Sequence, residues 1–370
     1  MKRQLLPWAV LFALALLPGC GDAGRDALTF GLAGPFGESY GASMQDGAEL
    51  ARDEINRAGG VNGRPLEFLA RDDGADPEQG IEVSQELLAA PQVVAVIGHV
   101  NSGVVTASAP IYDRGLPAVA TSATAPVIGQ LSDWLFRVAS SDSANAVALA
   151  ERSAELAADR TGLLYENNAY GRGLALSFIT ALAGFGAAPL ETDPYLESTE
   201  DFYPYLERLR RQGVRLIFIA GLQAGAAEII SQAREMGIDA RFIGGDGVEG
   251  LVTMGETYNG TLVGLMYHPD ASPRAAEFAE LFRAEYGREP DSFAALAYDA
   301  VMLVARAAEE GGASRSAIRD YLAGVGRDGG SEPYRGVAGT IRFDQHGDPV
   351  DKRFDIGVIR DGEIVLAPSQ

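Results

Sequence analysis

The stretch Val93-Val94-Ala95-Val96-Ile97-Gly98, with His99-Val100-Asn101-Ser102-Gly103 directly after it, decides the fold class of this chain. A continuous apolar run of this length is typical of a parallel strand that is covered on both faces. The small and polar residues that follow are typical of a loop leading into a helix. The stretch therefore predicts one strand–loop–helix unit of a parallel α/β sheet.

The same alternation of strands and helices extends outward from this stretch over most of the chain. Short apolar runs predict strands over 28–32, 66–69, 118–120, 161–165, 216–220 and 242–244. Apolar residues spaced three and four apart predict helices over 41–57, 81–89, 107–113, 144–158, 174–183, 202–212, 226–236, 275–286, 293–308 and 318–322. Near the end, 340–343 and 354–359 are predicted strands around the turn 346–348. About ten strands exceed one ordinary twisted sheet, so we expect two doubly wound parallel-sheet lobes.

The composition limits the partners and the chemistry of the chain. With 47% hydrophobic residues the chain can bury substantial cores, and its 370 residues predict two domains. A formal charge of -21 predicts a surface that repels nucleic acid, so we expect no nucleic-acid partner. The single cysteine cannot form an intramolecular disulfide, and the three histidines lack the spacing of paired metal ligands. We therefore expect no metal and no cofactor.

The first residues predict a secretory signal. Met1-Lys2-Arg3 is basic, the run from Leu5 to Leu17 is almost wholly apolar, and Leu17-Pro18-Gly19-Cys20 ends it with small residues. The apolar run is well short of the roughly 20 residues that a membrane-spanning helix needs. Leu17-Pro18-Gly19-Cys20 resembles a bacterial lipobox. This resemblance implies lipid on Cys20 and a protein anchored to a membrane in the periplasm or at the cell surface. The alternative is an ordinary signal peptide whose cysteine is incidental.

Three loops that follow predicted strands hold the candidate binding groups, because ligands of doubly wound sheets lie beyond the carboxyl ends of the strands. Residues 98–103 and 120–126 carry Ser and Thr hydroxyls ahead of a helix, a setting that can bind a carboxylate. Gly244-Gly245-Asp246-Gly247 can present a carboxylate to a ligand cation. Helix N-caps and an Asx turn are the alternative interpretations of these loops.

A set of short motifs occurs in order along the chain. They are Gly34-Pro35, Tyr40-Gly41, Glu54-Ile55-Asn56, Gly59-Gly60-Val61-Asn62-Gly63, Asp72-Asp73, Asp76-Pro77, Val96-Ile97-Gly98-His99, Ser122-Ala123-Thr124, Ala169-Tyr170-Gly171, Gly245-Asp246-Gly247, Ala297-Tyr298-Asp299-Ala300, Phe343-Asp344 and Gly347-Asp348. With these motifs, the chain from about Leu28 to about Val365 resembles the leucine/isoleucine/valine-binding protein family, the receptors of branched-chain amino-acid ABC importers.

The resemblance implies two lobes of the type I periplasmic-binding fold that close over a ligand as a hinge. Three hinge crossovers would fall near Ser140, His268 and Phe343. We accordingly expect the chain to divide into a signal peptide over 1–19, a lipidated linker over 20–27, an N-terminal lobe over 28–140 and 269–342, and a C-terminal lobe over 141–268 and 343–370.

The resemblance also implies a carboxylate site on the N-terminal lobe. Ser102 and Thr124 would hold the α-carboxylate of a ligand. Val100, Ser122 and Ala123 would lie nearby and contribute backbone contacts.

On the other lobe, Tyr170 and Asp246 would hold the α-ammonium of the ligand, and Tyr40 would pack against its side chain. The two tyrosines could alternatively be core residues. Leu222 departs from the family, because branched-chain binders tend to carry an aromatic residue at this position.

The implied function is capture of an amino acid, branched-chain or other, and its delivery to an ABC permease in the inner membrane. Relatives of the same fold also bind short amides, urea and aromatic acids, and a ligand-sensing receptor module would look the same in sequence. A secreted α/β hydrolase is the enzyme alternative, and its Ser nucleophile would stand on a Gly-x-Ser-x-Gly elbow. We expect the chain to lack this pentapeptide and to be no enzyme.

Overall fold

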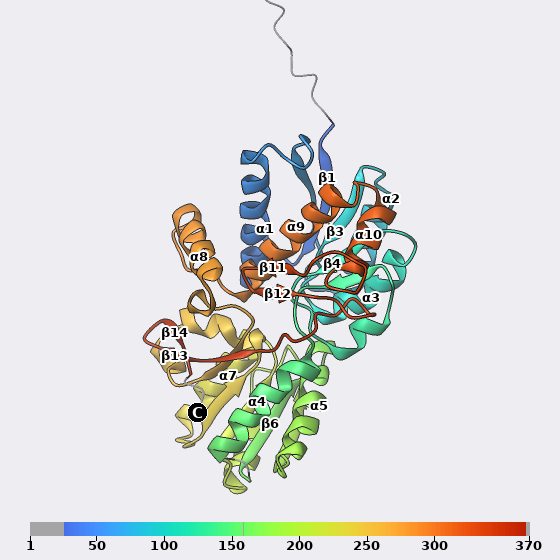
Figure 1. Cartoon of the computed structure of the whole chain (residues 1–370). Coiled ribbons are helices and arrows are strands. Elements are labelled where there is room, and N and C mark those ends of the chain that lie inside the picture. The colour runs from blue at the N-terminus through green and yellow to red at the C-terminus, as the bar shows by residue number, and fades with distance from the viewer. Residues whose placement is uncertain (1–25, 158, 368–370) are drawn as a thin grey trace, which may run out of the picture.

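The computed structural model describes residues 26–157 and 159–367, which form two α/β lobes stacked end to end (Figure 1). The N-terminal lobe is the upper one in this view, and the C-terminal lobe the lower one. The predicted signal peptide and Cys20 lie outside the described residues, as does most of the predicted linker. The prediction of two lobes built on largely parallel sheets is confirmed.

The N-terminal lobe is built on a five-stranded, wholly parallel sheet with the strand order β2-β1-β3-β4-β5. The strands are β1 (Leu28–Gly34), β2 (Leu66–Asp72), β3 (Val93–Ile97), β4 (Ala118–Ala120) and β5 (Leu135–Arg137). The helices of this lobe are α1 (Ser39–Arg57), α2 (Pro77–Ala89), α3 (Ser102–Tyr112), α8 (Pro273–Tyr286), α9 (Ser292–Glu310) and α10 (Arg315–Gly324). A short antiparallel pair, β11 (Tyr334–Gly336) and β12 (Gly339–Ile341), lies beside them.

The C-terminal lobe has a seven-stranded sheet with the order β14-β13-β10-β9-β8-β6-β7, in which β13 alone runs antiparallel to the other strands. The strands are β6 (Thr161–Glu166), β7 (Glu191–Tyr195), β8 (Leu216–Ala220), β9 (Arg241–Gly244), β10 (Leu262–Leu265), β13 (Asp355–Arg360) and β14 (Glu363–Leu366). The helices are α4 (Asp142–Ala157), α5 (Ala169–Gly184), α6 (Tyr203–Arg211) and α7 (Gln223–Glu235). Short 3₁₀ turns are η1 (Pro126–Gln130), η2 (Asp246–Thr253), η3 (Glu256–Tyr258) and η4 (Pro269–Ala271).

The chain passes between the two sheets three times, after β5, after β10 and after β12. Because the two sheets share no strand, the lobes can rotate about these three connections without breaking either sheet. The lobe boundaries at 140/141, 268/269 and 342/343 stay predictions.

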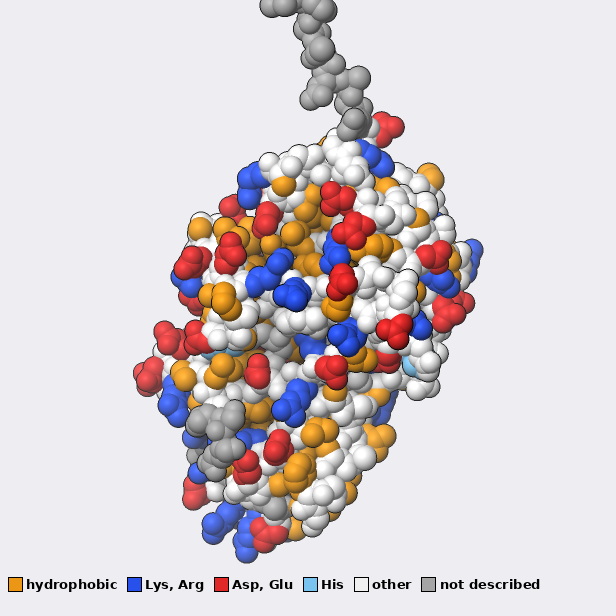
Figure 2. Space-filling view, in the orientation of Figure 1, with side chains coloured by type: hydrophobic (Ala, Val, Ile, Leu, Met, Phe, Trp, Pro, Cys, Tyr) orange, Lys and Arg blue, Asp and Glu red, His pale blue; other side chains and the backbone are white. Residues whose placement is uncertain are grey.

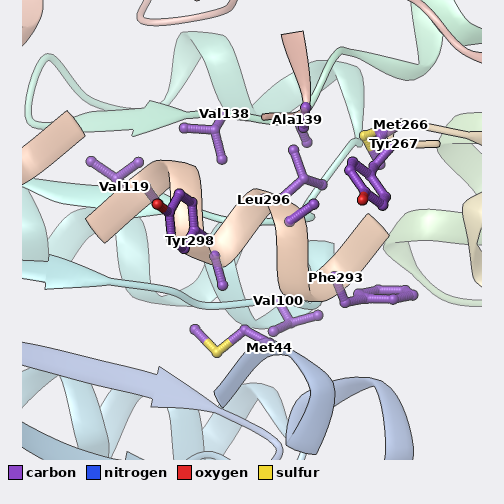
Figure 3. Packing of buried hydrophobic residues seen from close by; sticks show 14 of the residues in the cluster. Met44, Val100, Val119, Val138, Ala139, Met266, Tyr267, Phe293, Leu296 and Tyr298 are labelled. Carbon is purple, nitrogen blue, oxygen red and sulfur yellow. The ribbon is translucent and has the colours of Figure 1, made fainter. Parts of the chain in front are cut away.

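The core of the N-terminal lobe forms around α9, which is buried along most of its length. Its sequence is apolar on nearly all sides, as expected for a helix without a broad solvent face. Figure 3 shows Leu296 of α9 in the same cluster as Met44 of α1 and Val119 of β4. Gly47 lets α1 and α9 approach, because a Cβ there would lie 2.0 Å from the carbonyl oxygen of Ala294. This packing fixes the frame from which the cleft loops project.

Several sequence expectations about the elements are wrong. The strands β5, β7, β10, β11 and β14 were not predicted, because they are short or, like β7 with Asp193-Pro194, interrupted by residues that rarely occur in strands. The helix expected from residue 107 begins at Ser102. Strands do lie on both sides of the turn expected at 346–348, but they belong to different sheets, since β12 pairs with β11 whereas β13 pairs with β10 and β14.

The surface of the protein mixes both signs of charge. Figure 2 shows acidic and basic side chains interspersed over the face in view. Among the residues that the structure describes, none of the helices is both long and apolar enough to cross a membrane.

Candidate functional site

A cleft of about 370 Å³ lies between the lobes at the carboxyl ends of the strands. The loops after β2, β3 and β4 form one wall, and the loops after β6, β7, β8 and β9 form the other. Ligands of doubly wound sheets bind at this edge, where loops lead into helix N-termini. Most of the residues predicted to bind a ligand line the cleft, namely Tyr40, Val100, Ser102, Ser122, Tyr170, Leu222 and Asp246.

The N-terminal wall presents hydroxyl donors. Ser102 is the first residue of α3, and its Oγ accepts a hydrogen bond from the Ala125 N–H at 3.2 Å, so its own proton remains for another acceptor. Ser122 is 5% exposed, and within the described chain its Oγ has no hydrogen-bond partner. Together with the free N–H groups in the first turn of α3, these hydroxyls form a donor set for an anion such as a carboxylate.

Ala123 and Thr124 belong to the same loop but lie behind this wall. Both are almost fully buried, and neither lines the cleft. The Thr124 carbonyl accepts a hydrogen bond from the N–H of Asp142, which ties this loop to the first turn of α4. Burial, reinforced by the charge of Asp246, raises the pKa of Asp142 well above its usual range. A direct ligand contact of Ala123 or Thr124 stays a prediction.

The C-terminal wall presents a buried carboxylate. Asp246 begins η2 directly after β9 and is 3% exposed. Tyr170, in the first turn of α5, donates a hydrogen bond from its Oη to Asp246 Oδ1 at 2.8 Å and accepts one from the N–H of Gly247 at 3.2 Å. Burial raises the pKa of Asp246 to about 6, although the hydrogen bonds from Tyr170 and from the N–H of Gly247 act to lower it. An ammonium group that pairs with Asp246 would relieve the cost of burying its charge.

Aromatic and apolar side chains form the rest of the cleft. The rings of Tyr40 and Phe293 lie 5.4 Å apart, and Val100 lies beside Phe293 in Figure 3. Tyr195 comes from β7 and packs over Gly221, where a Cβ would lie 1.9 Å from the Tyr195 Oη. The Tyr195 ring therefore lies close to Leu222, the position at which branched-chain binders tend to carry an aromatic residue.

Glu166, Tyr195 and Phe293 are among the cleft residues that sequence reasoning missed. Glu166 ends β6 and is 4% exposed; it accepts hydrogen bonds from Asn168 Nδ2 at 2.6 Å and from the N–H of Leu222 at 3.1 Å. Its place at the carboxyl end of a predicted strand was the signal that could have found it. Tyr195 lies on a strand that was not predicted, and Phe293 returns to the cleft from a helix far along the chain.

Arg137 supports the loop that carries Ser122. It is fully buried at the end of β5 and forms a bidentate ion pair with Asp348, at 2.6 and 2.5 Å. Its Nη1 also donates to the carbonyl oxygen of Ala125 at 3.0 Å. The bidentate geometry fixes the guanidinium, so Arg137 ties the loop after β4 to the crossover segment that contains Asp348.

His99 belongs to a buried network rather than to the cleft. Its Nδ1 lies 2.6 Å from Asp73 Oδ2, and its Nε2 lies 2.7 Å from the Tyr112 Oη and 3.2 Å from the Ser84 Oγ. Ser, His and Asp occur together in hydrolase triads, but these side chains are all 0% exposed and the Ser84 Oγ donates to the carbonyl of Gly80. No substrate can reach this serine, and the network braces the turn between β3 and α3.

One Gly-x-Ser-x-Gly pentapeptide is present, Gly37-Glu38-Ser39-Tyr40-Gly41, so the expectation that the chain lacks it is wrong. It stands between β1 and α1, a strand-to-helix turn of the kind that a nucleophile elbow occupies. The Ser39 Oγ accepts a hydrogen bond from Gln223 Nε2 of the opposite lobe at 2.8 Å. None of the hydrogen bonds of the three described histidines reaches Ser39, so no histidine base activates it in this arrangement.

Comparisons with known proteins agree with this architecture. The family model described as "Periplasmic binding protein" matches residues 27–362. The Leu/Ile/Val-binding protein homolog 1 of Brucella suis is 31% identical over 316 residues, which cover 84% of this chain and 83% of the relative. The leucine-, isoleucine-, valine-, threonine-, and alanine-binding protein of Pseudomonas aeruginosa is 28% identical over 370 residues, covering 97% and 96%.

Solved structures give the same result. The ABC transporter substrate-binding protein of Desulfitobacterium hafniense in complex with Leu has a TM-score of 0.78 and 32% identity, covering 92% of this chain and 100% of that one. A leucine-binding protein of Thermotoga maritima has a TM-score of 0.84 and 25% identity, covering 92% and 98%.

Proposed function

The chain belongs to the periplasmic binding protein family, and we propose that it captures an amino acid between its two lobes as the substrate-binding component of an ABC importer. The observation that carries this proposal is the pairing of opposite chemistries across one cleft. The hydroxyls of Ser102 and Ser122 face it from one lobe, and the Tyr170–Asp246 pair faces it from the other. An amino-acid zwitterion carries one carboxylate and one ammonium, so it matches both walls.

In this proposal each charge of the ligand has a defined partner. Ser102 and Ser122 donate hydrogen bonds to the α-carboxylate, with the N–H groups at the start of α3. Asp246 accepts hydrogen bonds from the α-ammonium, and the Tyr170 hydroxyl holds the carboxylate of Asp246 in place. Charges that are taken out of water need such partners, because an unpaired buried charge is costly.

The relatives support an amino acid as the ligand class. Several of them are named for leucine, isoleucine and valine, and the Desulfitobacterium structure contains Leu. An aromatic acid, a short amide or urea would bring no ammonium group to Asp246. Such a ligand would leave the carboxyl either charged without a partner or protonated, so the geometry favours the amino acid.

We also propose that the protein delivers its ligand to a permease and is held at the membrane by lipid on Cys20. Cys20→Ala should then release the protein from the membrane fraction of a bacterial host or leave it unprocessed. Fractionation followed by mass spectrometry of the mature N-terminus checks this, and recovery of the wild type wholly without lipid would contradict it.

A ligand screen tests the main proposal. Amino acids, short amides, urea and aromatic acids are added singly to the purified protein, and its melting temperature is measured. A ligand that binds only the folded state raises this temperature, and we expect the rise with amino acids alone. A rise with an amide or an aromatic acid and with none of the amino acids would overturn the proposal.

A further inference from the structure

The charged residues that line the cleft are all acidic. They are Glu38, Asp76, Glu166, Glu197 and Asp246, and within the described residues no Lys, Arg or His lines this cleft. The face of the protein in view in Figure 2 carries side chains of both signs, whereas the charged residues of the cleft are all acidic. The α-ammonium of an amino acid pairs with one carboxylate, which leaves an excess of negative charge in the site.

Two of the remaining carboxylates lie together on the C-terminal wall. Glu166 is buried, and its two hydrogen-bond donors, Asn168 and the N–H of Leu222, are both uncharged. Burial and the nearby charge of Glu197 raise the pKa of Glu166. Glu197 itself is exposed at the mouth of the cleft, two residues beyond the end of β7. Neither carboxylate forms an ion pair within the described chain.

A second observation points to a ligand in the same place. The Tyr195 hydroxyl is buried and lines the cleft, and no group in the described part of the chain hydrogen-bonds to it. A Cβ added at Gly221 would lie 1.9 Å from the Tyr195 Oη and 3.3 Å from the Glu166 Cβ, so the hydroxyl lies close to the Glu166 side chain. Burial and the charge of Glu166 raise the pKa of Tyr195. A buried polar group without a partner is rare in native proteins and calls for an explanation.

Aromatic rings complete the surroundings. Tyr40 faces this region from the N-terminal lobe, and burial together with the charges of Glu38, Asp73 and Glu197 raises the pKa of Tyr40 to about 12. Tyr40 and Glu197 line the same cleft, and the hydrogen bond from Gln223 Nε2 to Ser39 Oγ at 2.8 Å joins the two lobes beside Tyr40. Carboxylates combined with the faces of Tyr rings form a setting that stabilises an organic cation.

We propose that the ligand is an α-amino acid with a cationic side chain, whose second positive charge lies between Glu166, Glu197 and Tyr195. The α-ammonium occupies Asp246 as in the proposed function, on which this inference rests. The side-chain ammonium or guanidinium donates to Glu166 and to the free Tyr195 oxygen, and Glu197 covers it at the mouth of the cleft. The ligand thereby neutralises the excess negative charge that closure of the lobes would bury.

Calorimetric titration with L-lysine and L-norleucine tests this inference, because the two ligands have the same carbon chain and differ by the terminal ammonium. L-ornithine, L-arginine and L-leucine extend the comparison. We expect lysine or another cationic amino acid to bind at least about tenfold more tightly than norleucine, as for a single charged pair. Glu166→Gln should reduce this ratio about tenfold and leave norleucine binding within about threefold, and the exposed Glu197→Gln should reduce it by about two- to fivefold.

Glu151→Gln, an exposed change on α4 outside the cleft, is the matched control and should change neither affinity. Melting temperatures of all variants are measured, and if Glu166→Gln unfolds, the exposed Glu197→Gln decides. Tighter binding of norleucine or leucine than of every cationic amino acid would overturn this inference and leave the proposed function intact. Binding of cadaverine with no amino acid bound would instead overturn the proposed function while retaining a cationic ligand.

Discussion

The two walls of the cleft have opposite chemistry although they are built in the same way, from loops that lead from parallel strands into helices. The N-terminal wall offers uncharged hydroxyl donors at Ser102 and Ser122, whereas the C-terminal wall offers carboxylates at Asp246 and Glu166. In the proposed function, each lobe alone therefore provides half of the site for a zwitterion. A ligand that contacts both halves binds the closed arrangement better than the open one, and it shifts the population toward closure.

The largest effect should follow from removing the carboxylate of the C-terminal wall. Asp246→Ala takes away the partner of the ligand ammonium, and loss of one member of a buried charged pair costs about 2–5 kcal/mol. We expect the affinity for the amino acid to fall roughly 30- to several-thousand-fold by calorimetry.

The fold should survive the Asp246 change, because the wild-type carboxyl is itself costly to bury. Asp239→Ala, an exposed position on the same lobe, serves as the control and should bind like the wild type. A variant with Asp246→Ala that binds within about threefold of wild type, under about 1 kcal/mol, would mean that the ligand has no ammonium at this position. The difference in charge between the two walls would then play no part in ligand binding.

A smaller effect should follow from the matching change on the N-terminal wall. Ser122→Ala removes one hydroxyl donor, and a hydrogen bond to a charged group contributes about 1.5–3 kcal/mol. We expect the affinity to fall roughly 10- to 150-fold. Ser108→Ala is the matched control, since Ser108 is likewise buried without a hydrogen-bond partner in the described chain but lies outside the cleft. Equal effects of the two serine changes would contradict a carboxylate site at Ser122.

The fold could be predicted to the extent that apolar patterning reports it. The buried run of β3 and the periodic face of α1 have unambiguous patterns, and both elements were predicted. The edge strand β7 reads Glu191-Thr192-Asp193-Pro194-Tyr195, where exposure to solvent removes the apolar pattern. The pairing of β13 with β10 could not be predicted for a different reason: the two strands come from distant segments, so their pairing leaves no local signal in the sequence.

The site was predictable where a loop follows a recognisable strand. Ser102, Ser122 and Asp246 all stand at such positions, and the resemblance to a known family placed Tyr40 and Tyr170 beside them. Tyr195 could not be found in this way, because its strand was not predicted. Its packing over Gly221 depends on the spatial order of β6, β7 and β8, which single-sequence patterns do not contain.

The affinity should also depend on pH, because the C-terminal wall presents the buried carboxyl of Asp246 to the ligand. Burial raises the pKa of Asp246 to about 6 in the free protein. An ammonium ligand needs the ionised carboxyl, so below this pKa binding must displace a proton. We expect the affinity to be constant above about pH 7 and to fall by about tenfold between pH 7 and pH 5, measured by calorimetry.

The stability of the free protein should respond to pH in the opposite sense. Because the folded state holds the Asp246 proton more tightly than the unfolded state, its contribution to stability is present below about pH 4 and is lost as the pH rises through about 6. Buried neighbours such as Asp142 and Glu249, whose pKa values burial also raises, act in the same direction. Comparing the melting temperatures of wild type and Asp246→Asn at pH 5 and pH 7 isolates the contribution of Asp246. A difference between the two melting temperatures that is the same at both pH values would contradict the raised pKa of Asp246.

The smallest effect should come from Leu222→Tyr, which adds a ring to the C-terminal wall without changing its charge. Leu222 is half-buried at the N-cap of α7, and its N–H donates to Glu166 through the backbone, so that hydrogen bond survives the substitution. Because the Tyr195 ring already packs over Gly221 next door, a second ring mainly narrows the space for the ligand side chain. We expect the affinity for amino acids with small side chains to rise about threefold relative to the affinity for those with large side chains, on the order of 0.7 kcal/mol. The contacts of the α-carboxylate and the α-ammonium should not change. Calorimetry with L-alanine and L-norleucine measures the ratio, and Leu176→Tyr on the exposed face of α5 is the control. If both ligands instead lose as much affinity as they do with Ser122→Ala, Leu222 positions Glu166 and does not merely shape the space for the ligand side chain.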